Sequence, residues 1–157
     1  MHALSPRRSA GFSLIELVIV VVIIGIIGAI AIPRLSRGAA GANDSALVGD
    51  LAVLRNAIDL YATEHGGTYP TVADIADQLT QYTDAAGATS ATKTTTHIYG
   101  PYIRKIPAAT VGTRPGATGF AAADAVGIGW LYNATTGEIT VNATTETDSA
   151  GKTYVTY

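Results

Sequence analysis

The chain has 157 residues, a length that suits one globular domain. Its hydrophobic fraction is 48% and its charged fraction only 14%, against about 25% charged residues in ordinary soluble domains. The formal net charge of −2 gives no reason to expect nucleic acid as a partner. The absence of cysteine excludes a disulfide framework and any metal or redox centre built on thiolates.

One apolar run dominates the N-terminal part of the chain. No residue from 17 to 32 is polar, whereas the rest of the chain is rich in Ala, Gly and Thr. As a helix, residues 12–32 are long enough to span a bilayer, which takes about 20 residues. Arg7 and Arg8 precede the run, so the positive-inside rule predicts a cytoplasmic N-terminus and export of the remainder.

Three interpretations of this run compete. A cleaved secretory signal would use the small-residue site at 29–31, Ala-Ile-Ala, but the run is longer than a usual signal core and contains Glu16. A plain uncleaved anchor explains the length and the arginines but gives Glu16 no role. A carboxylate within a membrane helix costs about 2.5–3.5 kcal/mol, so we expect Glu16 to have a function. A third interpretation accounts for all three features and rests on a resemblance.

Residues 11–17, Gly-Phe-Ser-Leu-Ile-Glu-Leu, are followed by a Val/Ile/Gly/Ala run and Pro33. This segment resembles the processing and assembly segment of type IV pilins and type II secretion pseudopilins. The resemblance implies that a prepilin peptidase cuts between Gly11 and Phe12 and that Phe12 is then N-methylated. It also implies that Glu16 becomes the fifth residue of the mature chain and that Pro33 bends the helix. Residues 1–11 would then be a prepilin leader, and residues 12–33 the transmembrane and assembly helix.

Glu16 is predicted to set the register between subunits. Cleavage would create an ammonium group on Phe12, and four residues at about 1.5 Å each place Glu16 about 6 Å further along the helix. In a staggered bundle, its carboxylate can meet the ammonium of a neighbouring subunit. Apolar surroundings make such a pair strong and an unpaired charge costly. Gly25 and Gly28 either allow close helix approach or are simply tolerated in a membrane helix.

Residues 34–65 are predicted to form the amphipathic half of the same helix. Apolar side chains recur there at steps of four, three, four and three, which places them on one stripe, and Gly66 and Gly67 then end the helix. We interpret the stripe as core packing, with a groove for a partner as the alternative. The stripe consists of Leu47, Leu51, Leu54, Ile58 and Tyr61.

Residues 66–157 are predicted to form a globular head. A capping box at Thr71–Asp74 precedes a short helix, and alternating apolar residues around a glycine-containing turn indicate a β-hairpin in which Trp130 packs in the core. The fold class is therefore α+β and pilin-like: a long N-terminal helix, half membrane and half amphipathic, packed on a small antiparallel sheet. The expected elements are a helix at about 72–82, variable loops at 84–96 and 108–125, a hairpin at about 127–142 and a third strand at 152–157.

Parts of the head strengthen the resemblance. Residues 51–61, 67–71 and 100–107 are similar to segments of the major, G-type pseudopilins. Such proteins often hold a calcium ion through clustered acids in a late loop. Here Asp124 stands alone in the sequence, and Thr147 separates Glu146 from Asp148. The sequence therefore predicts no cofactor, with calcium as an alternative.

No enzyme is predicted, because His65 and His97 lack paired ligands and no serine or threonine lies in a nucleophile elbow. The predicted function is that of a structural subunit of a type II secretion pseudopilus, processed by prepilin peptidase and polymerised through its N-terminal helix. The expected partners are copies of itself, prepilin peptidase, other pseudopilins, the inner-membrane assembly platform and, before assembly, the lipid bilayer.

The expected location is the inner membrane, crossed once with the N-terminus cytoplasmic and the head exported, and afterwards a periplasmic or surface filament. Two alternatives stay open at this point. One is a surface type IV pilin for adhesion, motility or DNA uptake, and the other is a monomeric membrane-anchored binding module.

Overall fold

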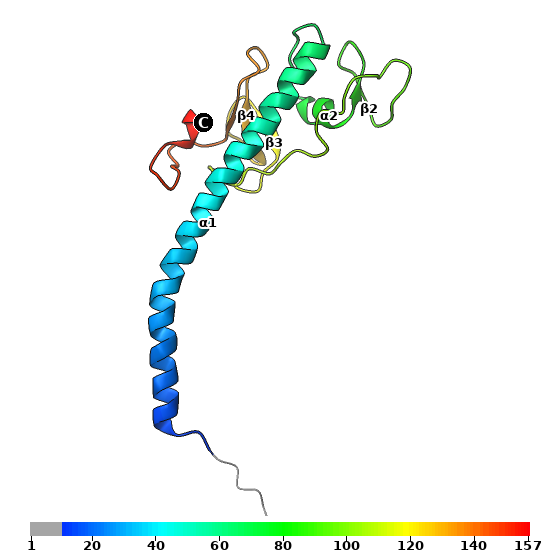
Figure 1. Cartoon of the computed structure of the whole chain (residues 1–157). Helices are drawn as coiled ribbons and strands as arrows, with labels where there is room; N and C mark the ends of the chain where they lie inside the picture. Colours follow the sequence, from blue (N-terminus) through cyan, green and yellow to red (C-terminus); the bar gives the residue numbers. More distant parts are fainter. Residues whose placement is uncertain (1–10) are drawn as a thin grey trace, which may run out of the picture. The chain divides into compact units, whose positions relative to one another are not determined.

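The computed structural model describes residues 11–157, which fall into two units. The first unit ends at Gly38 and the second is Ala39–Tyr157. Helix α1, Leu14–Glu64, contributes its apolar part to the first unit and its amphipathic part to the second (Figure 1). The α+β, pilin-like fold class is confirmed, with a long N-terminal helix and small sheets.

The amphipathic part of α1 forms one wall of the head. Its predicted stripe is buried, with exposed fractions of 2% or less from Leu47 through Leu51, Leu54 and Ile58 to Tyr61. The helix ends at Glu64 because the following Gly66 and Gly67 have positive φ angles of 65° and 89°. The Gly67 N–H closes the end by donating to the carbonyl of Ala62 at 2.7 Å.

Helix α2, Ile75–Thr80, is shorter than the predicted range of 72–82. The predicted capping box forms only in part. The Asp74 N–H donates to the Thr71 hydroxyl at 3.2 Å, and that hydroxyl donates to the Asp74 carboxylate at 2.9 Å, but the Thr71 N–H donates to Oε1 of Gln78 at 2.9 Å instead of to Asp74. The intervening residues make a turn instead of the first helical turn. After α2 the chain becomes extended in β1, Tyr82–Thr83, which pairs antiparallel with β2, Thr89–Ser90, inside the predicted loop at 84–96.

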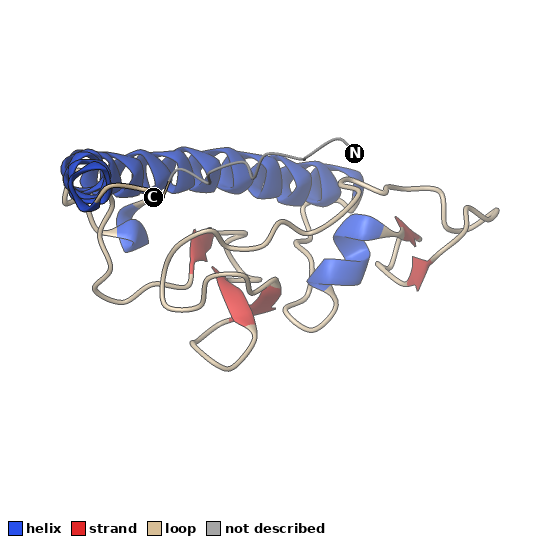
Figure 2. Cartoon of the chain, turned by 90° about the horizontal axis from the view of Figure 1, so that it is seen from below, coloured by secondary structure: helices blue, strands red, loops and turns tan. Residues whose placement is uncertain are grey.

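A three-stranded sheet has the order β3-β4-β5. Strands β4, Ile128–Tyr132, and β5, Ile139–Val141, form the predicted antiparallel hairpin. Strand β3, Gly119–Ala121, pairs parallel with β4, so the sheet is mixed and not purely antiparallel. Figure 2 shows these strands and α2 on one side of helix α1.

Two further predictions about the head, one of a loop and one of a strand, were wrong. The segment at 108–125 contains β3, whose pairing depends on small residues because a Cβ atom at Gly119 would lie 2.6 Å from the carbonyl oxygen of Gly127. The segment at 152–157 forms the 3-10 helix η1, Tyr154–Thr156, instead of a third strand. Its extended pairing is limited to one isolated bridge between Thr147 and Thr153.

One hydrophobic core joins the helix stripe to the sheet. Trp130 is fully buried and its indole N–H donates to the Pro107 carbonyl at 3.0 Å, while the Tyr132 hydroxyl donates to the Pro70 carbonyl at 2.9 Å. Each ring thus buries its apolar body and satisfies its polar tip. The strand residues of this core are Phe120, Trp130, Tyr132, Ile139 and Val141.

Candidate assembly site at the start of helix α1

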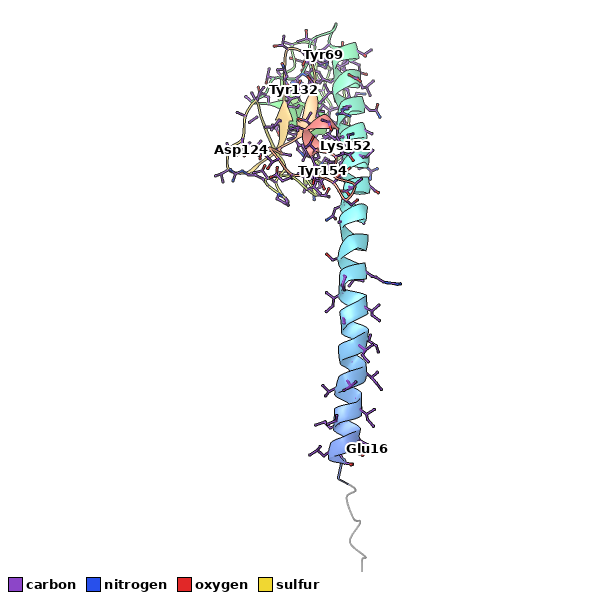
Figure 3. The ribbon with its side chains drawn as sticks, turned by 90° about the vertical axis from the view of Figure 1, so that its left-hand side faces the viewer. Glu16, Tyr69, Asp124, Tyr132, Lys152 and Tyr154 are labelled. Carbon is purple, nitrogen blue, oxygen red and sulfur yellow. The ribbon has the colours of Figure 1, made fainter. Side chains whose placement is uncertain are left out.

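Helix α1 starts with a local hydrogen bond that involves Glu16. The backbone N–H of Ser13 donates to Oε2 of Glu16 at 2.9 Å, and the Leu17 N–H donates to the Ser13 carbonyl at 3.2 Å (Figure 3 labels Glu16). A Ser followed three residues later by a Glu is the sequence of a capping box, in which the acid returns to the N–H of the first residue. Glu16 therefore satisfies one backbone donor that the helix itself cannot satisfy.

This local role was missed in the sequence, although the signal was present. Ser13-Leu-Ile-Glu16 has the same spacing as Thr71-Val-Ala-Asp74, where a capping box was predicted. Because an apolar run follows Glu16, the sequence indicated a role within the membrane and not a capping role. Within residues 11–157, Oε1 of Glu16 accepts no hydrogen bond, so one oxygen is held by the helix and the other is available to a further donor.

The apolar run is exposed on every side of α1. Phe12 is 84% exposed, and the large apolar residues from Leu14 to Ile32 are each between 47% and 80% exposed. Among the described helices, α1 is long and apolar enough to cross a membrane. Exposure of such an apolar surface to water is unfavourable. We therefore expect lipid or other apolar helices to cover it.

The other predicted site residues are placed as follows. Gly11 and Phe12 precede Ser13, the residue before α1, so one residue, Phe12, separates the predicted cleavage bond from the capping box. Pro33 lies inside α1, which continues through it, and the bend there stays a prediction. The leader residues before Gly11, including Arg7 and Arg8, lie outside the described residues.

The histidines of the head serve the fold. His65 is buried and stacks on Tyr61 with ring centroids 3.8 Å apart, and its Nδ1 lies 2.8 Å from the Tyr61 carbonyl. Its Nε2 lies 2.9 Å from the Asp84 carbonyl, which ties the end of α1 to the following loop. His97 contacts the hydroxyls of two threonines in its own loop. In the described part of the chain, no three His or acidic side chains gather into a potential metal site.

Comparison with known proteins agrees with this arrangement. Residues 6–32 match the family model of the prokaryotic N-terminal methylation motif. The chain is 31% identical over 104 residues to the type II secretion system core protein G of Aeromonas hydrophila, covering 66% of this chain and 68% of that protein. The chain belongs to the pseudopilin family of type II secretion core protein G. No solved structure matches this pseudopilin.

Family membership confirms the recognition made from residues 11–17 and from the head segments. It places the chain among structural, pilin-like proteins and not among enzymes. Together with the exposed apolar helix, the methylation motif indicates that this pseudopilin is anchored in a membrane.

Proposed function

We propose that this pseudopilin is a structural subunit of a type II secretion pseudopilus. A prepilin peptidase would cut between Gly11 and Phe12, Phe12 would be N-methylated, and the mature chain would polymerise through residues 12–33. The observation that carries the proposal is the apolar part of α1, exposed on every side, whose first turn holds one carboxylate, Glu16, close in sequence to Phe12. The similarity to a type II secretion core protein supports the choice of a pseudopilus.

The chemistry of assembly follows from the surroundings of that carboxylate. Lipid covers the apolar residues before assembly, so burial alone gives little preference for one helix arrangement over another. A pair of opposite charges in apolar surroundings is far more selective, because each misaligned neighbour leaves a charge unpaired. The Ser13 N–H orients Oε2 of Glu16, and Oε1 can then accept from the Phe12 ammonium of an adjacent subunit.

The proposed partners are further copies of this chain, prepilin peptidase, other pseudopilins and the inner-membrane assembly platform. The proposed topology has the N-terminus in the cytoplasm and the head exported, as the arginines of the leader predict. Cleavage would remove those arginines after the orientation has been established.

Two substitutions of Glu16 separate its capping role from its pairing role. Gln also fits the capping-box position but carries no charge, whereas Ala removes both properties. We expect Glu16→Gln and Glu16→Ala to be cleaved normally and both to lower the yield of filaments at least about tenfold, because the neighbouring ammonium is left unpaired. The measurement compares cleaved subunit and pelleted filament in cells that express the secretion machinery.

Asp59→Asn is the matched control, because Asp59 is an exposed acid of the same helix outside the apolar run, and it should assemble like the wild type. If Glu16→Gln forms wild-type filaments while Glu16→Ala does not, capping is sufficient and the charge-pairing mechanism is wrong. Normal filaments from both variants would contradict any assembly role of Glu16.

A further inference from the structure

The resemblance to G-type pseudopilins implies a calcium ion in the late loops. The contacts of the acids in these loops show whether they could bind such an ion. Asp124, Glu146 and Asp148 are the acids of these loops. A calcium site needs six to eight oxygen ligands that converge on one point and are free of other donors. Each of the three carboxylates in this head instead accepts hydrogen bonds from the chain itself.

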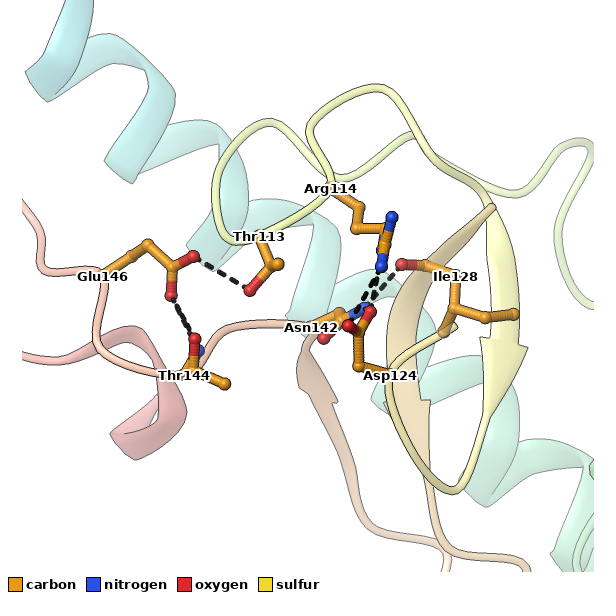
Figure 4. Close-up of polar contacts among 7 residues, drawn as sticks. All are labelled: Thr113, Arg114, Asp124, Ile128, Asn142, Thr144 and Glu146. Carbon is orange, nitrogen blue, oxygen red and sulfur yellow. Dashed lines mark hydrogen bonds and ion pairs between the residues drawn. The ribbon is translucent and has the colours of Figure 1, made fainter. Parts of the chain in front are cut away.

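Asp124 is bound in a fork by Arg114. Nε of Arg114 donates to Oδ1 at 2.8 Å and its terminal nitrogen donates to Oδ2 at 3.0 Å, so both carboxylate oxygens are engaged (Figure 4). The two side chains are 33% and 40% exposed, and paired geometry of this kind is the strongest form of an ion pair. The Arg114 guanidinium, followed by the Asn142 amide, lowers the pKa of Asp124 to about 2.

Asn142 is the third member of this cluster. It is 1% exposed, and its Nδ2 lies 2.8 Å from Oδ1 of Asp124 and 2.8 Å from the Ile128 carbonyl oxygen. The amide nitrogen thus stands between two oxygens that a cation would otherwise bridge. Turning the amide over would bring three acceptor oxygens together, and these would then need a cation or a hydrogen-bond donor between them. With the amide as it stands, Oδ1 of Asn142 has no partner in the described structure.

Glu146 is engaged separately from this cluster. Oε1 of Glu146 accepts from the Thr113 hydroxyl at 2.9 Å, and its Oε2 accepts from the N–H groups of Thr144 and Thr145 at 2.7 and 3.0 Å (Figure 4). Glu146 therefore closes its own turn and presents no oxygen toward Asp124.

Asp148 closes a second turn in the same way. Its Oδ1 accepts from the N–H groups of Ala150 and Lys152, both at 2.8 Å, and its Oδ2 accepts from the Tyr157 hydroxyl. The donor set of the late loops does not fit a calcium ion.

We propose that Arg114 is an internal cation that closes the late loops of the head in place of a bound divalent ion. The fork joins the loop before β3 to the loop before β4, and Asn142 joins both to the end of β5. A covalently attached guanidinium stays charged and cannot be removed by a chelator. The stability of the head is therefore independent of calcium.

The test uses the full chain in detergent, with the fluorescence of Trp130 as the reporter, because it is the sole tryptophan and is fully buried in the head. Thermal unfolding is followed after dialysis against EDTA and again in millimolar calcium chloride. We expect the wild-type Tm to differ by less than about 1 °C between the two. A saturable rise of several degrees in calcium would overturn the proposal, and this arm needs no variant to fold.

Arg114→Gln removes the charge and the guanidinium fork and keeps a polar but shorter side chain. We expect its Tm to fall by roughly 3–8 °C, with or without calcium. The matched control is Arg104→Gln, because Arg104 is exposed and makes no ion pair within residues 11–157, so its Tm should equal that of the wild type. Arg114→Lys keeps the charge without the fork and should also fall below the wild type. If Arg114→Gln and Arg114→Lys both melt like the wild type, the guanidinium does not close the loops.

Discussion

At the scale of single residues, one glycine determines how closely the β4–β5 turn can approach the rest of the head. Gly137 has a φ of 73°, and a Cβ atom there would overlap the ring of Tyr69. Two conditions therefore demand glycine: a left-handed backbone and the absence of a side chain. Tyr69 also packs against the core, so its ring connects the turn to the segment before α2.

Gly137→Ala should destabilise the head by about 2–4 kcal/mol, since it adds overlap with Tyr69 to the left-handed backbone cost. Gly127→Ala is the matched control: Gly127 has a φ of 83° but open space around it, so it isolates the backbone cost of about 1–2 kcal/mol. Denaturant unfolding followed by Trp130 fluorescence measures both. Equal losses would show that the contact with Tyr69 imposes no demand for glycine.

At the scale of elements, the segment after β5 is fastened to α1 by polar contacts. The Tyr154 hydroxyl donates to Oδ1 of Asp44 at 2.6 Å, and the Ser149 N–H donates to Oδ2 of the same acid at 2.9 Å. Arg55 donates to the carbonyl oxygens of Tyr157 at 2.5 Å and of Ile139 at 3.1 Å. These bonds hold the segment where the sequence had predicted a third strand.

Tyr154→Phe should lower the free energy of unfolding by about 1–2 kcal/mol, because it removes a hydrogen bond to a charged acceptor and keeps the ring. Tyr82→Phe is the matched control, since the Tyr82 hydroxyl makes no hydrogen bond within residues 11–157, and it should leave stability unchanged. Thermal unfolding of the two variants in parallel measures the difference. Indistinguishable Tm values for both variants and the wild type would mean that the segment is held by its apolar contacts alone.

The same polar contacts predict how stability depends on pH. Arg114 lowers the pKa of Asp124 to about 2, and backbone N–H groups around Thr144 lower the pKa of Glu146 to about 2. The hydrogen bond from Tyr154 lowers the pKa of Asp44. In the unfolded chain such acids titrate at about 4, so their contribution to stability is complete above pH 4. It is lost as the pH falls from about 4 toward 2.

We therefore expect Tm to be nearly constant from about pH 7 to pH 5 and to fall steeply below about pH 4. Thermal unfolding across this range, followed by Trp130 fluorescence, measures the dependence. Arg114→Gln should make the fall smaller, because Asp124 then titrates closer to its unfolded value and contributes less pH-dependent stability. A Tm that is flat down to about pH 2 would show that these acids do not stabilise the head.

Elements with strong periodicity could be predicted from the sequence, and others could not. One face of the helix is buried, and this produces the apolar stripe from Leu47 to Tyr61. In the same way, burial of one face of β4 and β5 produces their alternation of apolar residues. Strand β3 contains only one large apolar residue, Phe120, between small residues, so its pattern resembles a loop. The apparent alternation at 152–157 has another cause, because Tyr154 and Tyr157 direct their hydroxyls to acids.

The same distinction applies to the candidate sites. Gly11, Phe12 and Glu16 could be predicted because they lie together in one short motif. The Arg114–Asp124–Asn142 cluster could not, because its members are separated by ten or more residues and none is unusual in its local sequence. Only the pairing of β4 with β5 brings Asn142 beside Asp124, and tertiary geometry of that kind leaves no local pattern.

At the scale of the whole molecule, the two units bury their apolar residues in different ways. The head has its own core, which joins α1, α2 and the sheet. In the first unit, the large apolar side chains between Leu14 and Ile32 are all exposed. Substitutions in the head should therefore change stability, whereas substitutions near Glu16 should change membrane residence and assembly with little effect on the melting of the head.

Processing of this chain by prepilin peptidase can be read from the mass of its mature N-terminus. The chain is purified from membranes of cells that contain prepilin peptidase, and its N-terminal peptide is sequenced by mass spectrometry. We expect a peptide that begins at Phe12 and carries one methyl group on its amino nitrogen, with residues 1–11 removed. An intact Met1, or a chain that begins at Ile32 after cleavage by a signal peptidase, would contradict it.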